Sequence, residues 1–313
     1  MSNKFEGQER LGEMTNHEAY RSWAERNGFS DWALALLWII IAFVLFQITA
    51  AIVAMVVLVA KSGVTAMEAV KLLPERLGVL FIGNSTGQIL FLGLATCFFC
   101  RLQTSKDRRT SFLRFKIRND TAQKIALTAV LILAVQPTIW FLAWLNALIP
   151  VPDFFSKMQS TQMEMIENYL TSDHLLLITL FHVALVPALC EETLFRGYAL
   201  RAFQKSWSIW PAIIVSGLIF GLYHLQLSNL IPLASLGILF AFVTWISESI
   251  YPAIVAHFIN NGGSVLVGKY YPESAFAEIT PEMMPSFWAV IPSLIISAYI
   301  VYWMYNRHSK LSA

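Results

Sequence analysis

Residues 32–60 read WALALLWIIIAFVLFQITAAIVAMVVLVA, a stretch without a charged side chain. A helix needs about 20 predominantly apolar residues to cross a hydrocarbon layer about 30 Å thick. This run is therefore long enough to cross a membrane with some tilt. It predicts a membrane-spanning helix close to the start of the chain.

The whole chain has the composition of a membrane protein. Of its 313 residues, 57% are hydrophobic and 13% are charged, whereas soluble domains have about 45–50% apolar and about 25% charged residues. This composition excludes a soluble protein and predicts an integral membrane protein. The net charge of +2 is too small for the basic footprint of nucleic-acid binding, so no nucleic-acid partner is expected.

Seven further apolar runs follow the first. We therefore expect an all-α fold, a polytopic bundle of about eight transmembrane helices. No internal repeat or interdomain linker interrupts it, which predicts a single transmembrane domain over residues 32–306, between an N-terminal segment (1–31) and a tail (307–313). The eight runs are Trp32–Ala60, Val79–Cys100, Ile125–Ile149, His174–Cys190, Ile209–Tyr223, Leu230–Ile246, Tyr251–Val267 and Phe287–Asn306.

The distribution of basic residues predicts the orientation. The segment Arg101–Lys124 contains eight Lys or Arg residues and two Asp residues, and such segments stay on the cytoplasmic side. With eight spans, both termini are then cytoplasmic, and membrane lipids surround the protein. The same segment could also contact anionic lipid head groups, but we interpret it first as the determinant of topology.

Ionisable side chains inside apolar runs are costly, so they indicate function. The fourth run leads directly into Glu191, Glu192 and Arg196. Residues four apart share a helix face, so Glu192 and Arg196 can form an ion pair, which burial would require. Glu191 points elsewhere on the helix. It is the acid left free to act as a general base on water.

Two more runs carry histidines. His257 and Asn261 are four residues apart and share a face, as an amide and an imidazole that stabilise an oxyanion would. Phe220 and His224 have the same spacing, so the aromatic ring could fix the imidazole or face lipid. Asn260 points to another side and is expected to serve in packing.

The spacing around the turn at residues 204–208 predicts that two of these side chains meet. Glu191 precedes the turn by about 15 residues and His224 follows it by about 17, so they reach a similar depth in an antiparallel helix pair. Gly217 and Gly221 form a GxxxG step that allows another helix to approach. The two side chains then lie about 22 Å from the turn. Either the two helices project beyond the bilayer, or the side of the membrane assigned to this turn is wrong.

Together these residues resemble a known family. Glu191-Glu192-Thr193-Leu194-Phe195-Arg196 has the form EExxxR, Phe220 to His224 the form FxxxH, and His257 to Asn261 the form HxxxN. Three motifs in this order resemble the CPBP family, which contains the type II CAAX prenyl endopeptidases and bacterial bacteriocin-processing and self-immunity relatives. The resemblance covers residues 160–270, and the generic make-up of the chain is typical of a bacterial cell-membrane member.

The resemblance implies an intramembrane endopeptidase of the glutamyl type, which cleaves a peptide bond of a membrane-associated or lipidated substrate. The implied roles are Glu191 as the base that activates water, His224 as its partner, His257 and Asn261 as the oxyanion site, and Glu192, Arg196 and Phe220 as structural support.

A metal must be weighed against this mechanism. One glutamate and two histidines could hold zinc, but the chain has no HExxH motif, and the family resemblance favours a metal-free mechanism. We therefore expect no metal and no other cofactor.

Two other functions compete with proteolysis. A non-catalytic immunity or regulatory protein would bind a peptide or sensor partner in the same cavity, and substitution of Glu191 would then leave its phenotype intact. A transporter is less well supported, because no inverted repeat is evident. The segment Phe154–Leu170 could lie on the outer surface as an amphipathic element or gate the access of substrate.

Overall fold

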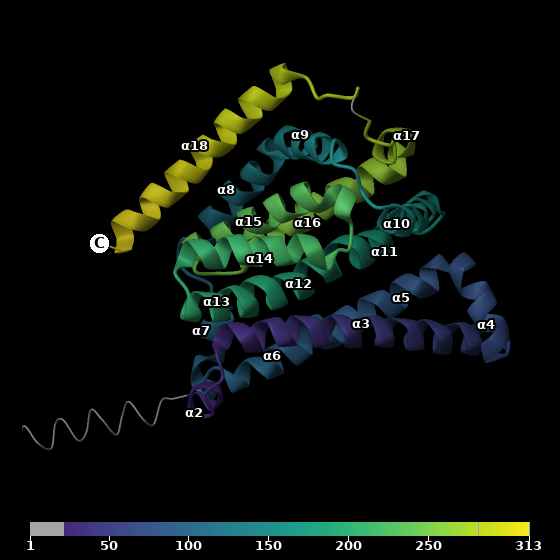
Figure 1. Cartoon of the computed structure of the whole chain (residues 1–313), viewed down its shortest axis with the longest axis horizontal. Helices are drawn as coiled ribbons and strands as arrows, with labels where there is room; N and C mark the ends of the chain where they lie inside the picture. The colour runs from purple at the N-terminus through teal and green to yellow at the C-terminus, as the bar shows by residue number, and fades with distance from the viewer. Residues whose placement is uncertain (1–21, 281, 313) are drawn as a thin grey trace, which may run out of the picture.

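The computed structural model describes residues 22–280 and 282–312 (Figure 1). Within these ranges every regular element is a helix, so the all-α prediction is confirmed. Residues 1–21 of the predicted N-terminal segment and residue 313 of the predicted tail lie outside the described residues.

The elements follow in chain order, with α for α-helices and η for 3₁₀- or π-helical turns. They are α2 (Trp23–Arg26), α3 (Asp31–Ser62), α4 (Ala66–Leu72), η1 (Leu73–Glu75), α5 (Leu77–Gly87), η2 (Gln88–Leu94), α6 (Ala95–Phe99), η3 (Cys100–Leu102), η4 (Lys106–Arg108), α7 (Arg109–Phe112), α8 (Thr121–Ala134), α9 (Gln136–Ala147), α10 (Asp153–Thr171), α11 (Leu176–Leu180), η5 (Phe181–Leu185), α12 (Val186–Glu192), η6 (Thr193–Ala199), α13 (Leu200–Ser206), α14 (Ile209–Tyr223), η7 (Leu227–Asn229), α15 (Leu230–Ser247), α16 (Tyr251–Tyr270), α17 (Pro272–Ala275) and α18 (Phe287–Ser312).

All eight predicted runs lie in helices, but they differ in length and polarity. Five of the described helices are long and apolar enough to cross a membrane, and the pair α8 and α9, bent by 46°, makes a sixth. The other two runs form α14, which has only 15 residues, and α16, which is interrupted by polar side chains. These two carry the site histidines and pack against α15 and α8, so other helices cover much of their surface.

One continuous helix, Leu176–Ser206, contains both motif glutamates. The fourth apolar run was expected to end at Cys190, but the helix continues for a further 16 residues and has π-helical turns at η5 and η6. Its 31 residues span about 46 Å, which exceeds the hydrocarbon thickness. The helix is therefore long enough either to tilt within the bilayer or to project beyond it.

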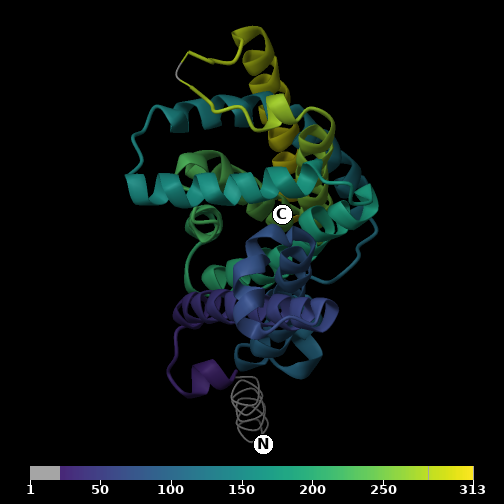
Figure 2. The same cartoon turned by 90° about the vertical axis from the view of Figure 1, so that its right-hand side faces the viewer.

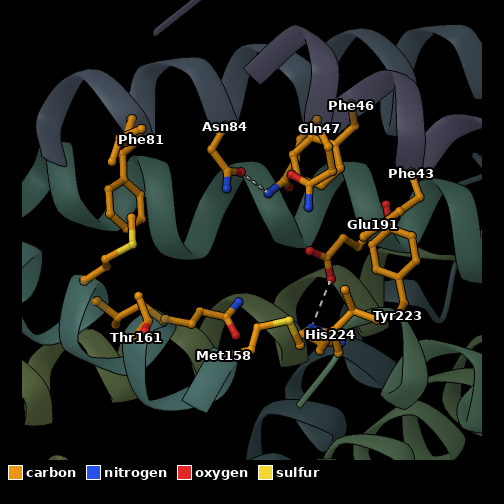
Figure 3. A pocket seen from close by; sticks show the side chains of 16 residues that line it. Phe43, Phe46, Gln47, Phe81, Asn84, Met158, Thr161, Glu191, Tyr223 and His224 are labelled. Carbon is orange, nitrogen blue, oxygen red and sulfur yellow. Dashed lines mark hydrogen bonds and ion pairs between the residues drawn. The ribbon is translucent and has the colours of Figure 1, made fainter. Parts of the chain in front are cut away.

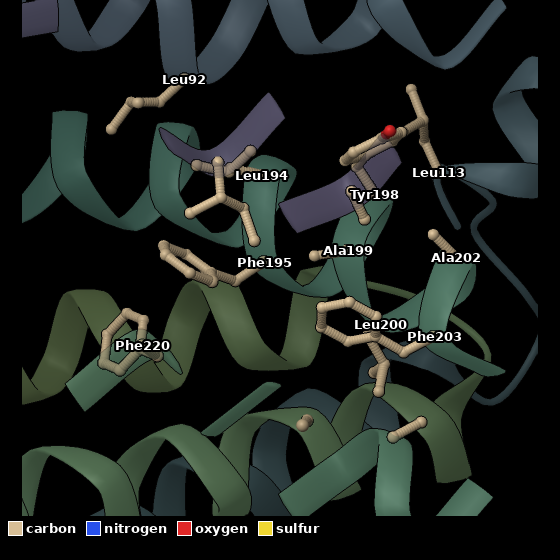
Figure 4. Close-up of a cluster of buried hydrophobic side chains, with 14 of the residues drawn as sticks. Leu92, Leu113, Leu194, Phe195, Tyr198, Ala199, Leu200, Ala202, Phe203 and Phe220 are labelled. Atoms are coloured by element: carbon tan, nitrogen blue, oxygen red, sulfur yellow. The ribbon is translucent and has the colours of Figure 1, made fainter. Parts of the chain in front are cut away.

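The main hydrophobic core surrounds the C-terminal half of this helix. Figure 4 shows its side chains between the neighbouring helices. Phe195, Tyr198, Leu200 and Phe203 are fully buried there, and dense packing of this kind fixes the helix that carries the glutamates.

The GxxxG step of α14 faces α15, as its spacing predicts. A Cβ atom on Gly221 would lie 2.9 Å from the main-chain nitrogen of Ala234, and one on Gly217 would overlap with Ile238. Small residues thus allow close contact between two main chains, and this contact positions His224 at the end of α14.

Gly221→Ala is therefore expected to destabilise the bundle by about 1–3 kcal/mol, because an added methyl group must displace main-chain atoms. The matched control is Gly263→Ala on α16, where a Cβ would meet no described atom within 4 Å. Alanine favours a helix over glycine there, so the control should not destabilise. The free energy of unfolding can be measured by SDS titration in mixed micelles. Equal losses for the two variants would contradict the assigned helix contact.

Helix α10 crosses one end of the bundle, as Figure 2 shows from that side. It covers the predicted segment Phe154–Leu170. The residues it turns inward recur at intervals of three and four, as on one face of an amphipathic helix: Met158, Thr161, Gln162, Met165 and Ile166.

Candidate active site

The two adjacent motif glutamates have different environments. Glu192 and Arg196 are fully buried, and Oε1 of Glu192 lies 2.9 Å from Nη1 of Arg196. Arg196 also donates from Nη2 to the carbonyl oxygen of Gly237 at 3.1 Å, and its guanidinium lies 4.2 Å from the centre of the Phe220 ring. The ion pair thus joins the helix of the glutamates to α14 and α15.

His257 extends this network from α16. Its Nδ1 is 2.8 Å from Oε1 of Glu192, and its ring stacks on Phe240 at 5.4 Å. Since a carboxylate can only accept, Nδ1 carries the proton in this contact. The other ring nitrogen, Nε2, lies 4.0 Å from Oε2 of Glu191.

Glu191 and His224 face each other across the helix pair. Nε2 of His224 is 3.9 Å from Oε2 of Glu191. Nδ1 of His224 donates to the carbonyl oxygen of Phe220 at 2.8 Å, so Nε2 of the neutral ring is unprotonated. The chain turns sharply afterwards, with Leu225 in the left-handed conformation at φ +56°.

This geometry is suited to holding a water molecule. Separations of 3.9 and 4.0 Å are too long for direct hydrogen bonds but short enough for a water bridge. A water between Glu191 and His224 can donate one hydrogen to each and keep a lone pair for attack on a carbonyl carbon.

A cavity of about 490 Å³ opens beside Glu191 and His224 (Figure 3). It is lined by α3, α5 and α10 as well as by the ends of α12 and α14. Its walls combine aromatic and Met side chains with amides: Phe43, Phe46, Phe81, Met158, Met165, Gln47, Asn84, Gln88 and Gln162. The cavity can take a chain with apolar side groups.

The structure brings Glu191, His224 and His257 together, whereas the side chain of Asn261 bonds elsewhere. Its amide nitrogen donates to the carbonyl oxygen of Val183 at 3.2 Å. Asn260, expected to serve only in packing, donates to Oδ1 of Asn261 at 3.2 Å and accepts a hydrogen bond from Gln136. Asn260 thus packs α16 against the start of α9 through a hydrogen bond.

Sequence reasoning missed the cavity residues Asn84, Gln88 and Tyr223. A polar amide inside the apolar run 79–100 is a signal of the same kind as the motif residues, but no family motif includes Asn84 or Gln88. It also missed Arg114, which lies outside the spans within the basic segment. Burial, together with the charge of Arg201, lowers the pKa of Arg114 to about 9.

In the described part of the chain, no group of three or more His, Cys, Asp or Glu side chains is arranged to hold a metal ion.

The geometry defines an integral membrane protein with a buried carboxylate, Glu191, and the His224 imidazole at the wall of a cavity, and with the buried His257 imidazole 4.0 Å from that carboxylate. Residues 173–263 match the family described as type II CAAX prenyl endopeptidase Rce1-like. All three motifs fall within this range, so the match supports the resemblance of this part of the chain to that family.

A curated relative matches over a shorter region. An uncharacterized 24.3 kDa protein of Escherichia coli is 37% identical over 62 residues, which are 19% of this chain and 29% of that protein. No solved structure matches the chain significantly.

Proposed function

We propose that the protein is an intramembrane endopeptidase that hydrolyses a peptide bond with water activated by Glu191. The observation that supports this most strongly is the convergence of two imidazole nitrogens, from His224 and His257, on Oε2 of Glu191 at 3.9 and 4.0 Å, at the wall of a cavity of about 490 Å³. The match of residues 173–263 to the type II CAAX prenyl endopeptidase Rce1-like family supports the same reaction class.

In the proposed reaction, Glu191 takes a proton from water while the water oxygen attacks the scissile carbonyl carbon. His224 orients this water through Nε2. The C–N bond of the tetrahedral intermediate then breaks, and Glu191 returns the proton to the leaving amine. The products are a new carboxyl group and a new amino terminus.

The other motif residues hold these groups in place. Glu192 and Arg196 neutralise each other, and the bond from Nδ1 of His257 to Glu192 fixes the imidazole beside Glu191. We retain the oxyanion role for Nε2 of His257 in its protonated form. Asn261 could share this role only after exchanging its hydrogen bond to Val183.

The cavity supports one class of substrate. Its apolar walls and its position within a membrane protein favour a membrane-associated or lipidated peptide. If Arg101–Lys124 faces the cytoplasm, as proposed with both termini, α10 covers the opposite end of the bundle. The expected location is a bacterial cell membrane.

A metal-free mechanism predicts that chelators leave cleavage unchanged. Preincubation of the purified protein with EDTA or 1,10-phenanthroline, followed by gel filtration, should alter the rate by less than twofold. Loss of activity that zinc restores would contradict this part of the proposal.

The proposed function can be tested with purified protein in lipid vesicles and a degenerate pool of apolar peptides in H₂¹⁸O. Wild-type protein should generate new carboxyl termini that contain ¹⁸O, whereas Glu191→Gln should not. If neither protein cleaves the pool although both are folded, the protease proposal loses its support and a binding role replaces it.

A further inference from the structure

Three residues that line the cavity each have a buried polar atom without a hydrogen-bond partner among the described residues. These atoms are Oε2 of Glu191, Oε1 of Gln88 and the hydroxyl of Tyr223. Folded proteins leave few such atoms, because each costs free energy unless a partner arrives. The catalytic water accounts for Glu191, whereas Gln88 and Tyr223 have no place in the proposed reaction so far.

Gln88 presents an acceptor in a fixed orientation. The side chain is only 7% exposed, and its Nε2 donates to Oδ1 of Asn84 at 2.7 Å. This bond fixes the orientation of the Gln88 amide and leaves Oε1 as its acceptor. Figure 3 shows the Asn84 side chain with this bond on the wall that faces α10, across from Met158 and Thr161. Gln88 also begins the π-helical turn η2, a feature frequent at functional sites.

Tyr223 presents a hydroxyl that can donate. Its ring is held edge-on by Phe43 at 4.9 Å and by Phe195 at 5.2 Å. It immediately precedes His224, so its position is set by the same helix end. The cavity thus offers a buried acceptor and a buried donor beside the proposed catalytic pair.

We infer that these two groups bind the main chain of an extended peptide, with Gln88 Oε1 accepting a substrate N–H and the Tyr223 hydroxyl donating to a substrate carbonyl. The inference rests on the proposed function and names its substrate class. A helical substrate already bonds its own N–H and C=O groups, so only an unwound segment satisfies both cavity groups. A prenyl or acyl group has no N–H donor to offer Gln88.

Binding can be tested without cleavage by keeping Glu191→Gln in every protein, reconstituted in lipid nanodiscs. The probe is a fluorescein-labelled pool of apolar hexapeptides, compared with the same pool N-methylated at alternate residues. N-methylation removes the N–H donor and adds bulk. Gln88→Met removes the acceptor while keeping the side-chain length. A matched control is Gln162→Met on the cavity rim, where the amide oxygen already accepts from Gln226 at 2.9 Å.

With Gln88 present, N-methylation should raise Kd about tenfold, as expected for one lost hydrogen bond. The ratio of the Kd of the N-methylated pool to the Kd of the unmodified pool should fall below twofold in Gln88→Met and stay near tenfold in Gln162→Met. Tyr223→Phe should weaken binding of the unmodified pool without changing the N-methyl ratio. An isoprenoid methyl ether, which has no hydrogen-bond donor, should not bind in a Gln88-dependent manner.

A ratio that stays near tenfold in Gln88→Met would show that only bulk matters and would overturn the inference. Equal binding of both pools to all proteins, or absence of binding, would overturn it as well. Failure of the proposed function gives a different result, because cleavage depends on Glu191 and binding does not. If the peptides bind as expected but wild-type protein does not cleave them, the peptide site stands and only the protease proposal fails.

Discussion

Glu191→Gln is expected to lower the rate of peptide cleavage on the order of 10³-fold or more, because the glutamine amide keeps the shape of the side chain but cannot accept a proton. Since Oε2 of Glu191 has no hydrogen-bond partner in the described residues, little structural support is lost. The free energy of unfolding should therefore stay the same or rise slightly. Rates of purified proteins in vesicles and SDS titrations would measure the two quantities.

His224→Gln should have a smaller effect, about 10²-fold, because it removes the group that orients water but leaves the base. Its bond to the carbonyl oxygen of Phe220 can be replaced by the glutamine amide. If Glu191→Gln retained more than about a tenth of the wild-type rate, Glu191 would not be the base.

Breaking the neighbouring ion pair should mainly lower the free energy of unfolding, whereas Glu191→Gln mainly lowers the rate of cleavage. Arg196→Met is expected to destabilise the protein by about 3–5 kcal/mol, because it leaves the fully buried Glu192 carboxylate without its counter-charge. Glu192→Gln should cost a similar amount, because Arg196 then remains charged in the core. SDS titration of each variant against the wild type would measure this loss.

The double variant Glu192→Gln/Arg196→Met separates charge from packing. It contains no uncompensated charge, and the glutamine oxygen can still accept the Nδ1 proton of His257. It should therefore be more stable than Arg196→Met alone, although the bond to Gly237 is lost. Additive losses from the two single variants would contradict a mutual interaction in the folded state.

The features that could be predicted from the sequence depend on spacing within one helix or between neighbouring helices. The distance of four residues predicted the ion pair of Glu192 with Arg196, and counting from the turn predicted the meeting of Glu191 with His224. The glycines of α14 predicted the close approach of α15. In each case the periodicity of the helix fixes which side chains share a face or depth.

The remaining features depend on contacts between distant segments. The bond from His257 to Glu192 joins residues 65 positions apart, and no periodicity relates α16 to α12. The helix continues beyond Cys190 because its charged residues find partners on other helices, which an apolar-run criterion cannot register. The cavity amides Asn84 and Gln88 become significant only once α5 is seen beside α10 and Glu191.

The most direct test of the central claim compares new peptide N-termini in membranes of cells that produce either wild-type protein or Glu191→Gln at equal abundance. Water activation by Glu191 predicts a set of membrane-protein or peptide N-termini present only with the wild type. Identical profiles from the two folded proteins would contradict the protease and favour a non-catalytic binding partner.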